Sequence, residues 1–179
     1  MANFALANST AIGAGNTQQN MASTYKSICV VGISSNTSAT AGYAGARRLK
    51  VYDILVGTNG TPADNAMEFD VTLITFTSSL TGITGTLVSS VSSNFGVDPA
   101  DTTFSAAMQI NSTGEAGITS VAERWYLGLN QRASYRWVCQ PGSELLTSNS
   151  ATANNGLALR ARSATYTSTV TGTILVSEQ

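Results

Sequence analysis

The sequence has no histidine and few charged residues, and both features exclude classes of function. Its 179 residues include nine Lys and Arg, ten Asp and Glu, and no His. Without histidine, Ser-His-Asp and Cys-His catalytic arrangements and His-containing zinc sites are excluded. The net charge of −1 creates no strong field, so no nucleic-acid partner is expected. We interpret the one basic cluster, Arg47, Arg48 and Lys50, as the solvent-facing start of a strand.

Cysteine is also scarce, and long apolar runs are missing. Cys29 and Cys139 are too few for the disulfide framework of a cystine-dependent secreted domain or for a four-thiolate zinc site. We expect two buried free thiols in a protein made in a reducing cytoplasm, with a Cys29–Cys139 bridge as the alternative. No run approaches the about 20 apolar residues that span a bilayer, and the N-terminal sequence lacks the features of a signal peptide. No membrane partner is expected.

Acidic residues leave one enzymatic hypothesis open. Glu68 and Asp70 fall on one face of an expected strand, about 7 Å apart, and a glycosidase needs only two carboxylates. The same spacing is common among solvent-facing strand residues, so we do not expect an enzyme. Asp98 with Asp101, and Asp64 with Asn65, carry oxygen ligands suited to calcium, but turns use these residue types anyway. No metal or other cofactor is expected.

Alternation of apolar and polar residues is the strongest structural signal in the chain. It is clearest at 67–77 and 156–162, and weaker alternation or short apolar runs occur at 27–33, 48–57, 83–91, 104–110, 117–121 and 169–177. Turn residues separate several of these segments, notably Asn59, Gly60 and Pro62. Asp98 and Pro99 give the one helix-start signal, from which we expect a single turn.

Residues 123–139 contain both tryptophans and are predicted to form two strands joined by a polar corner at 130–132. Alternation places Trp125 and Leu127 on one face of the first strand, and Tyr135 and Trp137 on one face of the second. Large aromatic rings dominate core energetics. We therefore predict that Trp125, Leu127, Tyr135 and Trp137 anchor the centre of the core.

Residues 1–25 differ from the rest because they are small, polar and nearly uncharged, without a sustained period. We predict an extended arm that becomes ordered on its own barrel or on a neighbouring subunit, with a frayed terminus as the alternative. The candidate assembly contacts in this arm are Phe4, Leu6, Ile12, Met21 and Tyr25. Residues 26–179 are expected to form a single all-β domain, a jelly-roll-like sandwich of about eight antiparallel strands.

Three segments resemble one group of viral proteins. Residues 1–16, the block at 53–66 and the block at 129–137 together look like small tailed-bacteriophage proteins associated with the head, and the resemblance continues to 157–162. It implies a virion protein, specifically a jelly-roll decoration (cement) subunit on the capsid exterior. It also implies synthesis in the bacterial cytoplasm, the major capsid protein as partner, and self-association, often as a trimer.

Two other functions remain open from the sequence. Jelly rolls often bind glycans through exposed aromatic rings, which makes a carbohydrate-binding module the main alternative. Its candidate residues are Tyr43, Tyr52, Tyr126 and Tyr166. The other is a glycan-cleaving virion enzyme that uses Glu68 and Asp70. A structural role fits the composition best, because a neutral, hydroxyl-rich surface suits a protein that packs against neighbours. A decoration protein needs no tight single site, since it repeats a modest contact over many copies.

Overall fold

The computed structural model describes residues 2–8, 19–20, 22–33, 48–59, 61–76, 84–88, 107–115, 118–147, 155–164 and 169–178, and these form an all-β structure. No helix occurs among them, and so no helix that could span a membrane. The expected turn at Asp98 and Pro99 lies outside these residues. The strands are β1 (Ala2–Ala7), β2 (Gln19–Asn20), β3 (Lys26–Ile33), β4 (Leu49–Asn59), β5 (Ala66–Phe76), β6 (Thr84–Val88), β7 (Ala107–Gly114), β8 (Ile118–Asn130), β9 (Tyr135–Val138), β10 (Leu145–Leu146), β11 (Asn155–Arg162) and β12 (Thr169–Glu178).

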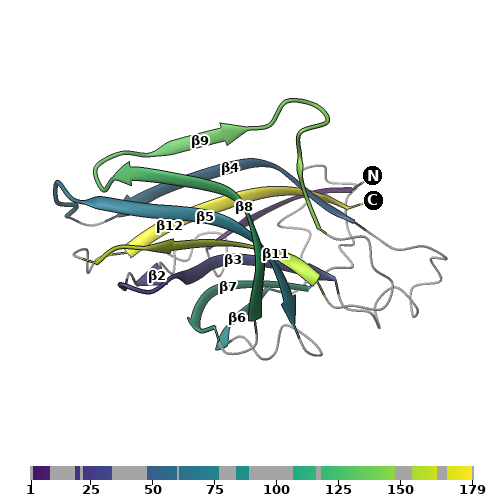
Figure 1. The fold of residues 1–179 in the computed structure, drawn as a ribbon, viewed down its shortest axis with the longest axis horizontal. Coiled ribbons are helices and arrows are strands. Elements are labelled where there is room, and N and C mark those ends of the chain that lie inside the picture. The colour runs from purple at the N-terminus through teal and green to yellow at the C-terminus, as the bar shows by residue number, and fades with distance from the viewer. Residues whose placement is uncertain are drawn as a thin grey trace.

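The strands form two antiparallel sheets (Figure 1). Sheet A has the order β1-β12-β4-β10, with β2 also paired to β12 and β9 also paired to β4; sheet B has the order β6-β7-β3-β11-β5-β8. Strands β3, β4 and β5 alternate between the sheets, as do β8, β9, β11 and β12. This confirms the predicted all-β sandwich, with more strands than the expected eight because several are short. The jelly-roll connection pattern remains a prediction.

The core lies between the sheets and is built from alternate residues of the central strands. β5 and β11 lie side by side, with Phe69 opposite Ala161 and Leu73 opposite Leu157, and all four side chains are buried. Sheet A contributes Ile54, Val56, Ile174 and Val176 from β4 and β12. Fully burying one such side chain is worth about 1.5–3 kcal/mol, so these alternating strands supply most of the apolar stabilisation.

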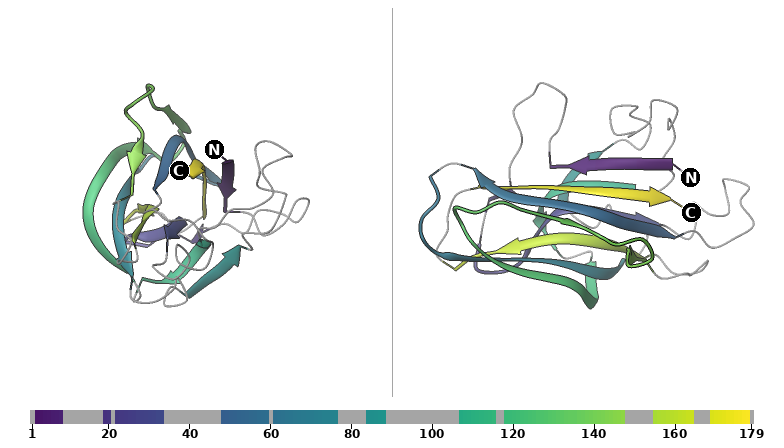
Figure 2. Two further views of the ribbon diagram at one scale, coloured as in Figure 1. Left: turned by 90° about the vertical axis from the view of Figure 1, so that its right-hand side faces the viewer. Right: turned by 90° about the horizontal axis from the view of Figure 1, so that it is seen from above.

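Residues 2–8 belong to this sandwich. β1 pairs along β12, with Phe4 opposite Val176 and Leu6 opposite Ile174 (Figure 2). Phe4 and Leu6 are 2% and 0% exposed and belong to the core cluster of their own chain. For residues 2–8 the structure shows the first of the two expected arrangements, ordering on the chain's own barrel. Phe4 and Leu6 are therefore core residues and not the assembly contacts expected of them, because their alternation was too short to be recognised as a strand. Ile12 and Met21 lie outside the described residues, and the boundary between an arm and a domain at residue 25 remains a prediction.

Asn8 extends the pairing of β1 beyond its last strand residue. Its Nδ2 donates to the carbonyl of Val170 at 2.9 Å, and its Oδ1 accepts from the backbone N–H of Gly172 at 3.0 Å. The side chain is 2% exposed, so loss of its amide leaves buried backbone groups without partners. We expect Asn8→Ala to lower the free energy of unfolding by about 1–3 kcal/mol in chemical denaturation. A loss below about 0.5 kcal/mol would show that β1 is not held in this way.

Candidate interaction surface

The exposed large apolar side chains of the described residues all belong to strands β4, β8 and β9. β8 ends sheet B, β9 lies at the margin of sheet A beside β4, and the turn after Asn130 joins them. We call strands β8 and β9 with the adjoining part of β4 the β8–β9 edge. It contains all of the exposed large hydrophobic residues in the described part of the chain: Leu55 (46%), Val121 (55%), Tyr126 (54%), Tyr135 (39%) and Val138 (59%).

Aromatic rings fill the space between these two edge strands. The ring centroids of Trp125 and Trp137 are 6.5 Å apart, and those of Trp125 and Tyr135 are 6.4 Å apart, both pairs tilted. Trp125, Leu127 and Trp137 are partly buried and pack against the core from its rim. The two tryptophans therefore contact the core from its rim and do not form the centre that was predicted for them. Tyr135 is 39% exposed and is no core anchor, because β9 is an edge strand.

A buried polar residue fixes the corner between β8 and β9. Gln131 is fully buried, and its backbone N–H donates to the carbonyl of Asn65 at 3.0 Å. Its side-chain Nε2 donates to Ser163 Oγ at 3.1 Å, while Thr58 Oγ1 donates to the Gln131 carbonyl. The corner is therefore anchored to the ends of β4 and β11, which sets the position of both edge strands.

The outer face of sheet A combines an ion pair with apolar side chains. Arg136 Nε donates to both carboxylate oxygens of Asp53 at 3.1 Å. Leu55 pairs directly with Arg136 in the ladder, and Val138 pairs with Asp53. Because Asp53 neutralises Arg136, this patch presents Leu55 and Val138 with little net charge.

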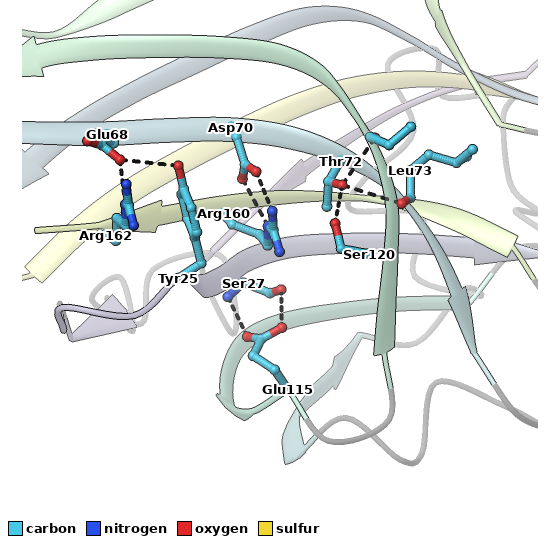
Figure 3. A network of polar contacts seen from close by, with 11 residues as sticks. Tyr25, Ser27, Glu68, Asp70, Thr72, Leu73, Glu115, Ser120, Arg160 and Arg162 are labelled. Carbon is cyan, nitrogen blue, oxygen red and sulfur yellow. Dashed lines mark hydrogen bonds and ion pairs between the residues drawn. The ribbon is translucent and has the colours of Figure 1, made fainter.

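The outer face of sheet B is different, since its charges are paired in a row (Figure 3). Arg160 contacts both carboxylate oxygens of Asp70, and Arg162 Nε donates to Glu68 Oε2. Both guanidinium groups lie over the ring of Tyr25, at 4.6 and 4.8 Å from its centroid. Tyr25, an arm residue expected to contact another subunit, therefore packs on its own chain.

The ion pairs make Glu68 and Asp70 unsuitable as the two catalytic carboxylates of a glycosidase. Arg162 lowers the pKa of Glu68, whereas a general acid needs a raised one. Burial raises the pKa of Asp70 against the opposing effect of Arg160, but its side chain is 2% exposed and both oxygens contact that guanidinium. Burial and then Asp70 raise the pKa of Tyr25 to about 12, which keeps its hydroxyl protonated. The row holds β3, β5 and β11 together.

The remaining candidate residues are dispersed. Tyr126 is exposed and Tyr52 is half-buried, while Tyr43, Tyr166, Asp98 and Asp101 lie outside the described residues. Asp64 pairs with Arg132 at 3.0 Å, and the described residues contain no group of three or more acidic, His or Cys side chains that could hold a metal. Both cysteines are free thiols; Cys29 is buried, which raises its pKa, but Cys139 is only partly buried.

Sequence reasoning missed the exposed residues Leu55, Val121 and Val138. Leu55 and Val138 follow the alternation of their strands, but sequence alone does not show which face is outward. Val121 lies in a strand, as expected for residues 117–121. Its side chain is exposed because the β5–β8 register shifts between Leu73 and Ile74, which makes Val121 an extra residue of β8. A β-bulge of this kind inserts an extra residue and leaves no reliable sequence signal.

Comparisons with known proteins give no family. No protein-family model and no curated protein matches the chain. Among solved structures, a chain of Desmodium yellow mottle tymovirus is 8% identical, with a TM-score of 0.34, over 98% of this chain and 84% of its own. A chain from infectious bursal disease virus Gx strain is 9% identical, with a TM-score of 0.14, over 98% of this chain and 38% of its own. Likenesses at these TM-scores do not identify a function.

Proposed function

We propose that the protein is a virion structural protein that binds the outside of a bacteriophage head as a decoration (cement) subunit. The observation that carries the proposal is that Leu55 and Val138 are exposed together on the outer face of sheet A, beside an ion pair whose charges cancel. Apolar patches of this kind mark protein interaction sites. The resemblance of residues 1–16, 53–66 and 129–137 to head-associated phage proteins supports the same function.

The outer face of sheet A is the part of this edge that we assign to the major capsid protein. Leu55 and Val138 project from it beside the Arg136–Asp53 pair. The patch is small, so a single contact is weak, but many subunits on one particle multiply its effect. Because Arg136 is already neutralised, attachment depends mainly on apolar burial and should be only weakly sensitive to salt.

The expected result of replacing both apolar residues is a loss of attachment. We expect Leu55→Ser/Val138→Ser to bind cognate capsids at least about tenfold more weakly in co-sedimentation, since each serine removes apolar area that the contact buries. Ala63→Ser, an exposed small substitution in the 61–65 turn, is the matched control and should bind normally. Unchanged binding by the double variant, with an unchanged thermal midpoint, would rule out this surface.

The predicted arm, residues 2–25, is a second proposed attachment segment that would clamp the domain to the capsid or to a sister subunit, although its strands β1 and β2 pair with β12 of the same chain. Deletion of residues 2–25 would not test it cleanly, because it removes β1 with Phe4 and Leu6 from the core. The truncated protein would lose stability as well as any clamp. Cryo-microscopy of the intact particle tests the segment directly.

A carbohydrate-binding module remains the second candidate, because of one residue. The ring of Tyr126 is 54% exposed on the face of sheet B that also presents the Glu68–Arg162 pair. Sugars stack on such rings and hydrogen-bond to neighbouring charged groups. Binding on a glycan array that is lost in Tyr126→Ala would favour this function, and an array without signal would eliminate it.

A further inference from the structure

The outer side of β8 is an exposed strand edge. Within the described residues, β8 pairs with β5 and with no other strand. It runs for 13 residues along the outside of sheet B (Figures 1 and 2). Its described side chains are exposed or only partly buried. Such an edge presents backbone groups that can pair with another strand.

The side chains of β8 are arranged symmetrically about one point. Glu123 and Arg124 are adjacent and opposite in charge, and neither forms an ion pair with another described residue. Val121 lies two residues before this pair and Tyr126 two residues after it, and both are more than half exposed. Residues 121–126 therefore follow the same pattern in both directions. An exposed apolar residue stands at each end, an inward-facing residue comes next, and the two charged residues are in the middle.

We propose that β8 pairs antiparallel with β8 of a second copy of this chain, about a two-fold axis between Glu123 and Arg124. In this register Glu123 lies opposite the partner's Arg124, and the symmetry repeats the contact. Val121 lies against the partner's Tyr126, and Ala122 lies opposite the partner's Trp125. An isologous contact of this kind uses the same patch on both subunits, which requires self-complementarity.

Two β-bulges lie within this contact. The β5–β8 register shifts between Val71 and Thr72 and again between Leu73 and Ile74, which makes Arg124 and Val121 the extra residues of β8. Bulges and charges on an edge strand prevent indiscriminate pairing. Within residues 121–126 the charges add a second restriction, because only the two-fold register matches every charge with its opposite. The contact is short, so the dimer should be reversible and dependent on protein concentration.

This inference goes beyond the proposed capsid function and does not depend on it. Leu55 and Val138 lie on sheet A, whereas the two-fold contact uses the edge of sheet B. A dimer therefore leaves the assigned capsid patch free. It also differs from the trimer implied by the phage resemblance, since a three-fold ring requires heterologous contacts.

Sedimentation equilibrium of the full chain over a range of concentrations tests the proposal. The unaltered protein should fit a monomer–dimer equilibrium. Glu123→Arg places two arginines opposite each other twice per dimer and should raise the dissociation constant at least about tenfold. Arg124→Glu should do the same with two acids. The swapped variant Glu123→Arg/Arg124→Glu restores opposite charges in the same register and should return to within about threefold of the unaltered protein.

Arg48→Glu is the matched control, because it makes the same charge change as Arg124→Glu at an exposed residue away from β8 and should dimerise normally. Circular dichroism and the thermal midpoint establish that each variant is folded. A monomer at every concentration, a trimer, or a folded swapped variant that stays monomeric would each overturn the proposed interface.

Discussion

Gly156→Ala is expected to destabilise the fold strongly. A Cβ on Gly156 would lie 2.2 Å from the carbonyl oxygen of Val31 and 2.9 Å from Cα of Gly32. These are backbone atoms of β3, which pairs with β11 at this point, so no side-chain rotation can relieve the contact. We expect a loss of about 3–5 kcal/mol in the free energy of unfolding, a large part of the about 5–15 kcal/mol typical of a domain. Urea denaturation followed by tryptophan fluorescence measures it.

Two other strand glycines make a graded control series. At Gly172 the added Cβ would meet side-chain atoms of Ile28 and Leu159, each at 2.9 Å. Side chains can move in part, so Gly172→Ala should cost about 1–3 kcal/mol. At Gly128 nothing lies within 4 Å, and Gly128→Ala should be within about 0.5 kcal/mol of the unaltered protein. If Gly156→Ala and Gly128→Ala were equally stable, the close pairing of β11 with β3 would be wrong.

Arg160→Met is expected to cost about 3–5 kcal/mol near neutral pH. Its partner Asp70 is 2% exposed, and Arg160 itself is 17% exposed. Removal of the guanidinium leaves a buried carboxylate without its counter-charge, which costs far more than the pair contributes when intact. The double variant Asp70→Asn/Arg160→Met removes that charge and should recover part of the loss. Thermal and urea unfolding of the three proteins give the comparison.

The matched control for this prediction is the neighbouring pair. Glu68 and Arg162 are 31% and 44% exposed, so water screens their attraction, and Arg162→Met should cost only about 0–1 kcal/mol. Equal losses from Arg160→Met and Arg162→Met would contradict the buried character of Asp70.

The cost of Arg160→Met should also depend on pH. Burial raises the pKa of Asp70 in the folded protein, and the guanidinium opposes that rise. A carboxyl whose folded pKa is raised contributes stability that is present below its unfolded pKa and lost as the pH rises through the folded pKa. Without Arg160 that pKa rises further, so the deficit should shrink towards pH 4 and grow towards pH 7.

Alternation predicted the central strands well because those strands are regular. The segments 67–77 and 156–162 match β5 and β11, and their inward residues Phe69, Leu157 and Leu159 are buried as expected. The corner at 130–132 is also in place, with Gln131 in the turn between β8 and β9. In each case the local pattern and the tertiary environment agree, so the sequence is sufficient.

Prediction failed where the outcome depended on neighbours in space. Trp125 and Trp137 lie at the rim of the core because β8 and β9 are each at the edge of a sheet. The order of strands in a sheet cannot be predicted from the residues of one strand. Phe4 and Leu6 are core residues only because distant β12 receives them. For the same reason the exposure of Leu55, Val121 and Val138 could not be predicted from their own segments.

The pairing of β1 with β12 has a consequence for synthesis on the ribosome. β1 is made first among the described strands, but its partner β12 is made last, after all of the others. During translation Phe4 and Leu6 therefore lack their contacts with β12, and the pairing of sheet A stays incomplete. Long-range pairing of this kind slows folding and leaves apolar side chains and unpaired strand edges exposed in the nascent chain. We expect native structure to form late, after β12 has left the exit tunnel.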